Sequence, residues 1–356
     1  MNRRSVNGVL LAAMLSLAAG GPLAQAGAQA GSPSPGPSTP TLNDRLQGDI
    51  APTHDPVIIR EGDTYHVFST GIGDGPDRIL AHRVSQDLVH WRKAPPPLSA
   101  LPAWAARAIP GATNAWAPDL SFVAGRYRLY YSISTFGSNR SAIGLLSSPT
   151  LDAARPDYGW RDDGMVVLSS PSNDFNAIDP NFVAARDGTH WLALGSFWSG
   201  LKMFALDPAT GKLRTAGEAP VSIARRPVPA GAPAPVEAPF VIDHGGWYWL
   251  IASYDYCCKG NASTYYTVIG RSRAITGPYL GKDGSAMMQG GGTILLRADL
   301  PEKQRFRGPG HAGHLRDRDG TDYLVYHAYD RQEKGIPTLR IVRLRWGADG
   351  WPVPEG

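Results

Sequence analysis

The sequence predicts an all-β fold, a five-bladed β-propeller, from a pattern that recurs along the chain. Each copy begins with a polar residue, often followed by proline, and continues with a short apolar run, a glycine turn and an aromatic-rich alternating segment. Five copies are present, and self-similarity of this kind indicates a repeat architecture. Sustained helical spacing is nearly absent in a chain with 41 glycines and 31 prolines.

Each copy has the alternation and the glycine-containing turn of a β-hairpin. Equivalent aromatic residues in the second half of each hairpin are separated by 62, 64, 57 and 75 residues. This period accommodates four short strands with their loops, which is the size of one propeller blade. The hairpins are predicted over residues 55–68, 117–131, 179–194, 237–251 and 311–326, with equivalent aromatics Tyr65, Tyr127, Trp191, Tyr248 and Tyr323.

Further strand-like runs lie between the hairpins and supply the outer strands of the blades. A β-sandwich made of many hairpins is the alternative fold, and the regular repeat disfavours it. The additional strands are predicted over residues 79–84, 143–147, 202–206, 267–272 and 339–346.

The N-terminal residues predict export of the protein. Arg3 and Arg4 precede an apolar run over residues 9–19 that ends in small residues with two Ala-Gln-Ala sites, so residues 1–30 are predicted to be a signal peptide. The apolar run is too short to span a bilayer, and we expect no membrane anchor. Residues 31–44 read as a Pro/Ser/Gly-rich linker, and residues 45–356 as the propeller catalytic domain of a secreted or periplasmic protein.

Charge and cysteine content narrow the possible partners. Removal of residues 1–30, which hold two arginines and no acidic residue, lowers the formal net charge from +4 to +2. The basic residues are dispersed, so we expect no nucleic-acid partner. We also expect the protein to be a monomer. The two cysteines, Cys257 and Cys258, are adjacent and cannot connect distant segments. The sequence leaves two possibilities for them, a disulfide between neighbouring residues or a pair of free thiols.

The repeat also brings charged residues to one place. The first strand of every propeller blade lines the central channel, so residues at the starts of these strands converge. Asp55, Asp179, Glu237 and His311 occupy these positions, and residues 116–119 supply the fifth. Crowded carboxylates raise one another's pKa, and cleavage of a glycosidic bond needs one carboxyl group as acid and another as base. An aspartate before proline also caps turns, which is the structural alternative.

Aromatic residues near the predicted channel are candidates for stacking on sugar rings. Trp116 and Trp198 lie beside polar, glycine-rich turns, where residues that face ligands concentrate. Trp247 is expected to be a core residue instead, because large aromatics dominate β-sheet cores.

From about residue 48 to the C-terminus the chain resembles the arabinanases of glycoside hydrolase family 43. Each motif alone is weak, and their order and spacing together are specific. The motifs are His54-Asp55-Pro56, residues 114–119, 134–138, 141–145, 176–180 and 195–200, Glu237-Ala238-Pro239, residues 256–260 with 263–265, and residues 308–311.

The resemblance implies an inverting hydrolase of α-1,5-linked L-arabinofuranose chains, with arabinan or arabino-oligosaccharides as partners. It assigns Asp55 as general base, Glu237 as general acid and Asp179 as the residue that orients the acid and tunes its pKa. It further implies a calcium ion at the propeller axis, held by His311 and mostly by water. Calcium prefers oxygen ligands, so a hydrogen-bonded structural role for His311 is the alternative. The expected sugar contacts are Trp116, Phe136, Gly137, Asn176, Ser196, Phe197 and Trp198.

The mode of cleavage has more than one interpretation. By analogy with the family, residues 256–260 and the lack of a second, C-terminal domain favour an endo-acting arabinanase. An exo-acting α-L-arabinofuranosidase or β-xylosidase would use the same three acids. A carbohydrate-binding propeller without catalysis is the alternative from another class, and the presence of all three carboxylates speaks against it.

Overall fold

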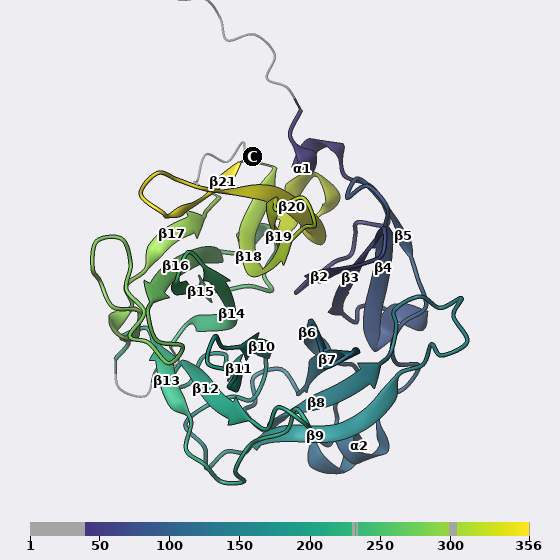
Figure 1. Cartoon of the computed structure of the whole chain (residues 1–356), viewed down its shortest axis with the longest axis horizontal. Coiled ribbons are helices and arrows are strands. Elements are labelled where there is room, and N and C mark those ends of the chain that lie inside the picture. Colours follow the sequence, from purple (N-terminus) through teal and green to yellow (C-terminus); the bar gives the residue numbers. More distant parts are fainter. Residues whose placement is uncertain (1–39, 230–231, 233, 299–304, 356) are drawn as a thin grey trace, which may run out of the picture. The chain divides into compact units, whose positions relative to one another are not determined.

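The computed structural model describes residues 40–229, 232, 234–298 and 305–355, and these residues are almost entirely strands and turns. The predicted signal peptide (1–30) and residues 31–39 of the predicted linker lie outside the described residues. Within the described part, no helix is long and apolar enough to cross a membrane. The strands form five sheets arranged as the blades of a propeller, so the predicted fold class is confirmed (Figure 1).

Each blade is one continuous stretch of chain, and its first strand lies innermost (Figure 1). Blade 1 contains β2 (Val57–Glu61), β3 (Thr64–Thr70), β4 (Leu80–Ser85) and β5 (His90–Lys93). Blade 2 contains β6 (Trp116–Val123), β7 (Arg126–Ile133), β8 (Ser141–Ser148) and β9 (Arg161–Ser169). Blade 3 contains β10 (Asn181–Ala184), β11 (His190–Leu194), β12 (Leu201–Leu206) and β13 (Val221–Ala224). Blade 4 contains β14 (Val236–His244), β15 (Trp247–Tyr254), β16 (Tyr266–Ser272) and β17 (Thr293–Leu296). Blade 5 contains β18 (Phe306–Arg316), β19 (Asp322–Asp330), β20 (Ile336–Trp346) and β21 (Pro352–Glu355).

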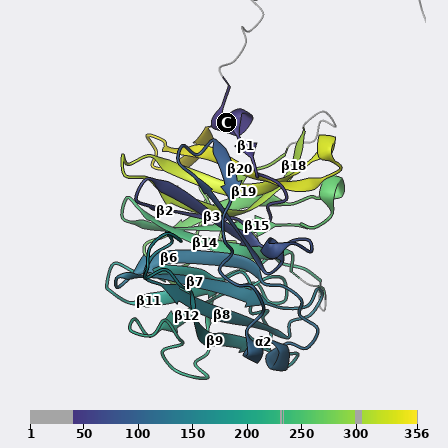
Figure 2. The same ribbon diagram turned by 90° about the vertical axis from the view of Figure 1, so that its right-hand side faces the viewer.

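Short helices occupy the connections between strands. In both views α2 lies beside the outer strands of blade 2, where the indole N–H of Trp104 donates to Asp162 Oδ1 at 3.4 Å (Figures 1 and 2). The helical segments are α1 (Leu42–Arg45), α2 (Ala103–Ala108) and the 3₁₀ turns η1 (Pro76–Arg78), η2 (Gly260–Ala262), η3 (Met287–Gln289) and η4 (Arg331–Glu333).

The predicted repeat matches the observed strands closely. In every blade the equivalent aromatic is the second residue of the second strand, from Tyr65 in β3 to Tyr323 in β19. The five runs predicted as additional strands fall on the third strands, β4, β8, β12, β16 and β20, with an offset of only a few residues at their ends. Local alternation and glycine turns therefore define the blades.

Five clusters of buried apolar side chains fill the spaces between neighbouring blades. Phe68 and Leu129, for example, pack between blades 1 and 2, and Leu250 packs with Met203 between blades 3 and 4. Full burial of one such side chain stabilises a fold by about 1.5–3 kcal/mol. Because each sheet is covered on both faces, the strands that carry the cavity residues have little freedom to shift.

The segment before blade 1 connects the first blade to the last. Its strand β1 (Gln47–Gly48) pairs in parallel with β5 of blade 1. The side-chain carbonyl of Asn43 accepts from the backbone N–H of Ile341 in blade 5 at 2.7 Å. The last residues of the predicted linker, 40–44, are among the described residues and lead into α1. Thr41 and Asp44 form a capping box on α1, which stabilises this helical turn.

Candidate active site

A ring of strained residues surrounds the propeller axis. In each blade, one non-glycine residue that lies just before the first strand or within it has a φ of 45–58°. This left-handed conformation is uncommon for residues with a side chain and is held by tertiary contacts. These residues are Asp55, Ala117, Asp179, Ala238 and His311.

The backbone N–H of each of these residues donates to a side chain of the preceding blade. The donor–acceptor distances are 2.8–3.1 Å, so five hydrogen bonds link the blades around the axis. The acceptors, in the order of the ring residues, are His327 Nδ1, Thr70 Oγ1, Ser132 Oγ, Asp179 Oδ2 and Ser253 Oγ.

The expected equivalence of Glu237 with the other blade starts is wrong by one residue. Ala238, not Glu237, occupies the ring position in blade 4. The pairing of β14 with β15 shifts its register between Glu237 and Phe240, as the pairings of β6 with β7 and of β18 with β19 also do near their ring residues. Glu237 nevertheless lines the same cavity as Asp55 and Asp179.

A single cavity of about 790 Å³ opens at this ring. It brings together side chains from all five blades, and all residues that the sequence proposed for catalysis, sugar contact or metal binding line it. They are Asp55, Trp116, Phe136, Gly137, Asn176, Asp179, Ser196, Phe197, Trp198, Glu237 and His311.

Asp55 is buried and surrounded by hydrogen-bond donors. Its Oδ1 lies 2.7 Å from His54 Nδ1 and 3.0 Å from His311 Nδ1. Its Oδ2 accepts from the hydroxyl of Thr70 at 2.5 Å. Burial by itself would raise the pKa of Asp55, but His54 and His311 outweigh burial and hold this pKa well below its usual range. Asp55 is therefore a carboxylate at neutral pH, as a general base must be.

Glu237 and Asp179 have fewer donors on the other side of the cavity. Glu237 Oε2 accepts from the hydroxyl of Ser196 at 2.7 Å, and Asp179 Oδ2 accepts from the backbone N–H of Ala238 at 3.1 Å. Burial raises the pKa of Glu237, and it raises the pKa of Asp179 well above its usual value, with the charge of Glu237 adding to the effect. This pair retains a proton under conditions in which Asp55 has lost its own.

His311 connects the two sides of the cavity. Burial opposes its charge, but attraction to Asp55, with Asp179 and Glu237 adding to it, raises the pKa of His311 to about 9. Because Nδ1 faces Asp55, Nε2 is the nitrogen that is left for another ligand. A carboxylate on one imidazole nitrogen and a metal on the other is a common arrangement in metal sites. Among the described residues, no group of three close metal-ligating side chains includes His311.

The candidate sugar-contact residues lie on the loops around the cavity. Phe136, between β7 and β8, is 86% exposed and available for stacking. Phe197 and Trp198 adopt φ values of 57° and 40° in a tight turn after β11, and the turn is closed by a hydrogen bond from Gly200 N to Phe197 O. Asn176 is buried, and its side-chain carbonyl accepts from the Ser141 hydroxyl at 2.6 Å.

Sequence reasoning did not assign a role to three residues that contact Asp55. His54 precedes Asp55 in the first motif, and only the aspartate of this motif was assigned a role. Thr70 is equivalent to Ser132 and Ser253 at the end of the second strand, so comparison of the repeats at this position would have found it. His327 lies in β19 within an apolar alternating segment, a pattern that gave no functional signal.

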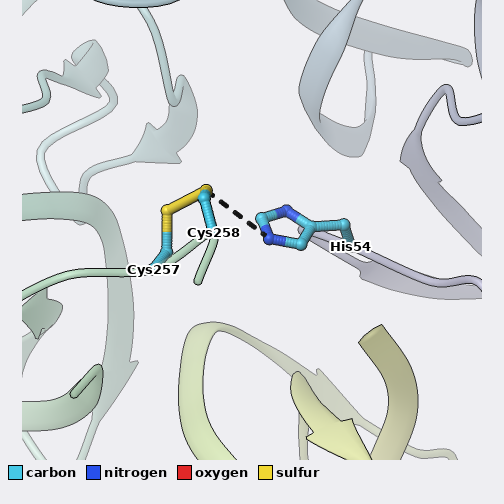
Figure 3. A group of neighbouring side chains, drawn as sticks. All are labelled: His54, Cys257 and Cys258. Atoms are coloured by element: carbon cyan, nitrogen blue, oxygen red, sulfur yellow. Dashed lines mark hydrogen bonds between the residues drawn. A yellow bond between two sulfur atoms is a disulfide. The ribbon is translucent and has the colours of Figure 1, made fainter. Parts of the chain in front are cut away.

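The two cysteines form a disulfide, which settles the alternative that the sequence left open. They follow β15 and line the cavity beside His54 (Figure 3). Cys258 Sγ lies 3.9 Å from His54 Nε2.

The cavity with its three carboxylates can be compared with known proteins. Residues 50–352 match the family described as Glycosyl hydrolases family 43. The chain belongs to this family. The membership that the motifs indicated is thereby confirmed, and the match covers all five blades.

Similar members of family 43 include enzymes of both cleavage modes. The chain is 42% identical over 307 residues to an extracellular exo-α-(1→5)-L-arabinofuranosidase of Cellvibrio japonicus, covering 84% of this chain and 85% of the relative. It is also 42% identical over 300 residues to an extracellular endo-α-(1→5)-L-arabinanase of Bacillus subtilis, covering 84% and 86%.

Solved structures of family members agree with the fold. The α-L-arabinanase of Cellvibrio cellulosa, in complex with arabinohexaose, superimposes with a TM-score of 0.79 at 39% identity and covers 86% of this chain and 96% of that one. The family 43 endo-arabinanase of Bacillus licheniformis gives a TM-score of 0.77 at 44% identity, with coverage of 86% and 99%.

Proposed function

We propose that this family 43 hydrolase cleaves the α-1,5-L-arabinofuranosidic bonds of arabinan with inversion of configuration, acting as an endo-arabinanase. The observation that carries the proposal is the placement of Asp55 and Glu237 on different blades of one cavity, with unlike partners. Asp55 is bound by imidazole and hydroxyl donors that favour a carboxylate, whereas Glu237 has the hydroxyls of Ser196 and Tyr265 and a second buried acid beside it, and its pKa stays raised. The relatives named above act on α-(1→5)-linked arabinan, which supports the choice of substrate.

The mechanism is a single displacement. Asp55 takes a proton from a water molecule as the water oxygen bonds to the anomeric carbon. The bond from that carbon to the glycosidic oxygen breaks, and Glu237 donates its proton to the departing oxygen. Attack from the face opposite the leaving group inverts the anomeric configuration. Asp55 then releases its proton to solvent and Glu237 regains one, which restores the starting state.

Asp179 and His311 support these two residues. Asp179 accepts the Ala238 N–H and thereby holds the backbone next to Glu237. The charge of Glu237 raises the pKa of Asp179, and because the two groups titrate as a pair, an ionised Asp179 would oppose ionisation of Glu237 in the same way. His311 donates from Nδ1 to Asp55. We include a calcium ion that would be held by His311 Nε2 and water in the proposal, because three buried carboxylates lie near enough to His311 to act on its charge. When bound, the ion would supply positive charge that offsets the repulsion among these carboxylates.

Analysis of products tests the proposal. Linear debranched arabinan should yield a ladder of oligosaccharides, and NMR of the first turnovers should show the inverted anomer. Release of a single product size would instead identify the exo mode, the second candidate, which the relative from Cellvibrio japonicus favours. If the protein binds arabinan and releases no reducing sugar, it is a non-catalytic carbohydrate-binding propeller.

Export of the protein is a further part of the proposal. Residues 1–30 would direct secretion and be removed, in line with the two relatives that are described as extracellular. N-terminal sequencing of the protein recovered from culture medium and periplasm would locate both the cleavage site and the compartment.

A further inference from the structure

The Cys257–Cys258 disulfide forms part of the cavity wall, and the proposed mechanism does not use it. Cys257 is half-buried and Cys258 is exposed, and both line the cavity that holds the three carboxylates. Figure 3 shows the disulfide facing His54, the neighbour of the general base. These are the two cysteines of the chain, so any thiol chemistry of this protein takes place here.

The loop that carries the disulfide is held in a strained conformation. Asp255 and Cys258 have φ values of 68° and 60°, in the left-handed region that residues with side chains seldom adopt. The carbonyl of Tyr256 accepts from the Ser263 hydroxyl at 2.9 Å, which fastens one part of the loop. Such a backbone persists only where surrounding contacts and covalent links hold it.

Hydrogen bonds connect this loop to the general base. The backbone N–H of Cys258 donates to the hydroxyl of Tyr329 at 2.7 Å. The same hydroxyl lies 2.8 Å from His54 Nε2, and His54 Nδ1 lies 2.7 Å from Asp55 Oδ1. The roles are consistent if Tyr329 donates to Nε2 and His54 donates from Nδ1 to the carboxylate. The position of the disulfide loop is therefore fixed relative to Asp55.

The surface that the disulfide presents is suited to a sugar ring. Disulfide sulfurs offer no hydrogen-bond donor and have no thiolate with which to bind a metal, so they form a soft apolar surface. The Tyr256 ring continues this surface and approaches the Phe197 ring, with a centroid distance of 5.8 Å. Carbohydrate cavities combine apolar walls with a few placed polar groups, and here the polar groups are the carboxylates beside the wall.

We propose that the oxidised Cys257–Cys258 disulfide binds one arabinofuranosyl ring of the substrate chain, packing against its C–H face beside Asp55. This inference rests on the proposed function for its ligand. An external dithiol supplies two electrons and two protons that break the S–S bond and form two thiols, while the dithiol itself becomes a disulfide. The loop then loses its covalent constraint, and the contact with the sugar ring is lost.

Binding can be measured without turnover in the Glu237→Gln variant. Calorimetric titration with linear arabinohexaose should show a Kd that rises about tenfold after reduction with dithiothreitol, the effect of losing one apolar ring contact. Reoxidation should restore the first value. The triple variant Glu237→Gln/Cys257→Ser/Cys258→Ser should bind as weakly as the reduced protein and be insensitive to dithiothreitol.

Equal Kd values for Glu237→Gln and the triple variant would overturn the inference, whether or not dithiothreitol reaches the disulfide. A second control is Glu237→Gln/Tyr329→Phe, which keeps the disulfide and removes the hydroxyl that bonds the loop to His54. Because the disulfide itself stays intact, the Kd of this variant should rise less than it does after reduction. A loss of binding in this variant as large as that caused by reduction would assign the effect to the hydrogen bonds and contradict a sulfur contact. Absence of arabinohexaose binding in every form, together with an inactive wild type, would instead reject the proposed function.

Discussion

The two sides of the cavity differ in their hydrogen-bond donors and not in their burial. Asp55, Asp179 and Glu237 are 8%, 7% and 7% exposed, so loss of solvent penalises the three carboxylates to a similar degree. On the side of blades 1 and 5, two imidazoles and a hydroxyl stabilise the charge of Asp55. On the side of blades 3 and 4, a backbone N–H bonds to Asp179, and the hydroxyls of Ser196 and Tyr265 bond to Glu237, and these donors do not outweigh burial. The hydrogen-bond donors around each side chain therefore decide that the pKa of Asp55 is lowered, while the pKa values of Asp179 and Glu237 in the same cavity are raised.

Removal of either reacting carboxyl should have the largest effect. Asp55→Ala and Glu237→Ala should each lower kcat on arabinan by about a hundredfold to ten-thousandfold, the range for loss of a general acid or base. Neither side chain fills the apolar core, so both variants should melt at a temperature close to that of the wild type. Residual activity near the wild-type level in either variant would remove that residue from the reaction.

Asp179→Asn should have a smaller effect on kcat, about tenfold or less, and should change the pH profile. Glu237 acts in its protonated form, so activity is lost as pH rises through its pKa. Glu237 raises the pKa of Asp179, and repulsion between two coupled acids is mutual, so removal of the Asp179 carboxylate should lower the pKa of Glu237. The alkaline limb of kcat against pH should therefore move to lower pH. An unchanged alkaline limb would exclude the tuning role.

Thr70→Val tests the opposite side, and Ser132→Ala is its matched control. Thr70 donates to Asp55 and also accepts the Ala117 N–H, whereas Ser132 accepts the equivalent N–H of Asp179. Asp55 acts as a carboxylate, so activity is lost as pH falls through its pKa. Loss of the Thr70 donor should raise that pKa and move the acidic limb to higher pH. The acidic limb should stay in place in Ser132→Ala. Equal shifts of this limb in both variants would mean that the hydrogen bonds between blades, and not the bond from Thr70 to Asp55, cause the effect.

Chelation should give the smallest effect, on stability. An ion bound only by the native state stabilises it by about 2.7 kcal/mol when its concentration is a hundredfold above Kd, which raises Tm by several degrees. Thermal melts with a chelator should therefore lower the Tm of the wild type and leave His311→Ala almost unaffected. Equal responses of the two proteins would count against metal binding at this residue.

The candidate site could be predicted in its main parts because its residues lie at repeated places in a repeated unit. Asp55 and Asp179 both precede proline before a first strand, and counting from the hairpin glycines brought them together with Glu237 and His311. The same counting gave Glu237 the ring position that the next residue, Ala238, occupies in blade 4. The ring position is marked by the left-handed φ of Ala238 and by its N–H bond to Asp179, and a count of residues from the hairpin glycine shows neither.

The sequence by itself determined the blades, because alternation, glycine turns and apolar runs act between residues close along the chain. Only the tertiary structure decided what surrounds each carboxylate. His327 accepts the N–H of Asp55 across 272 residues of chain, and Cys258 reaches His54 across 204. It also decided that residues before blade 1 bond to blade 5, as Asn43 does to Ile341. Contacts between blades depend on how the whole sheet ring packs, and no local pattern carries that information.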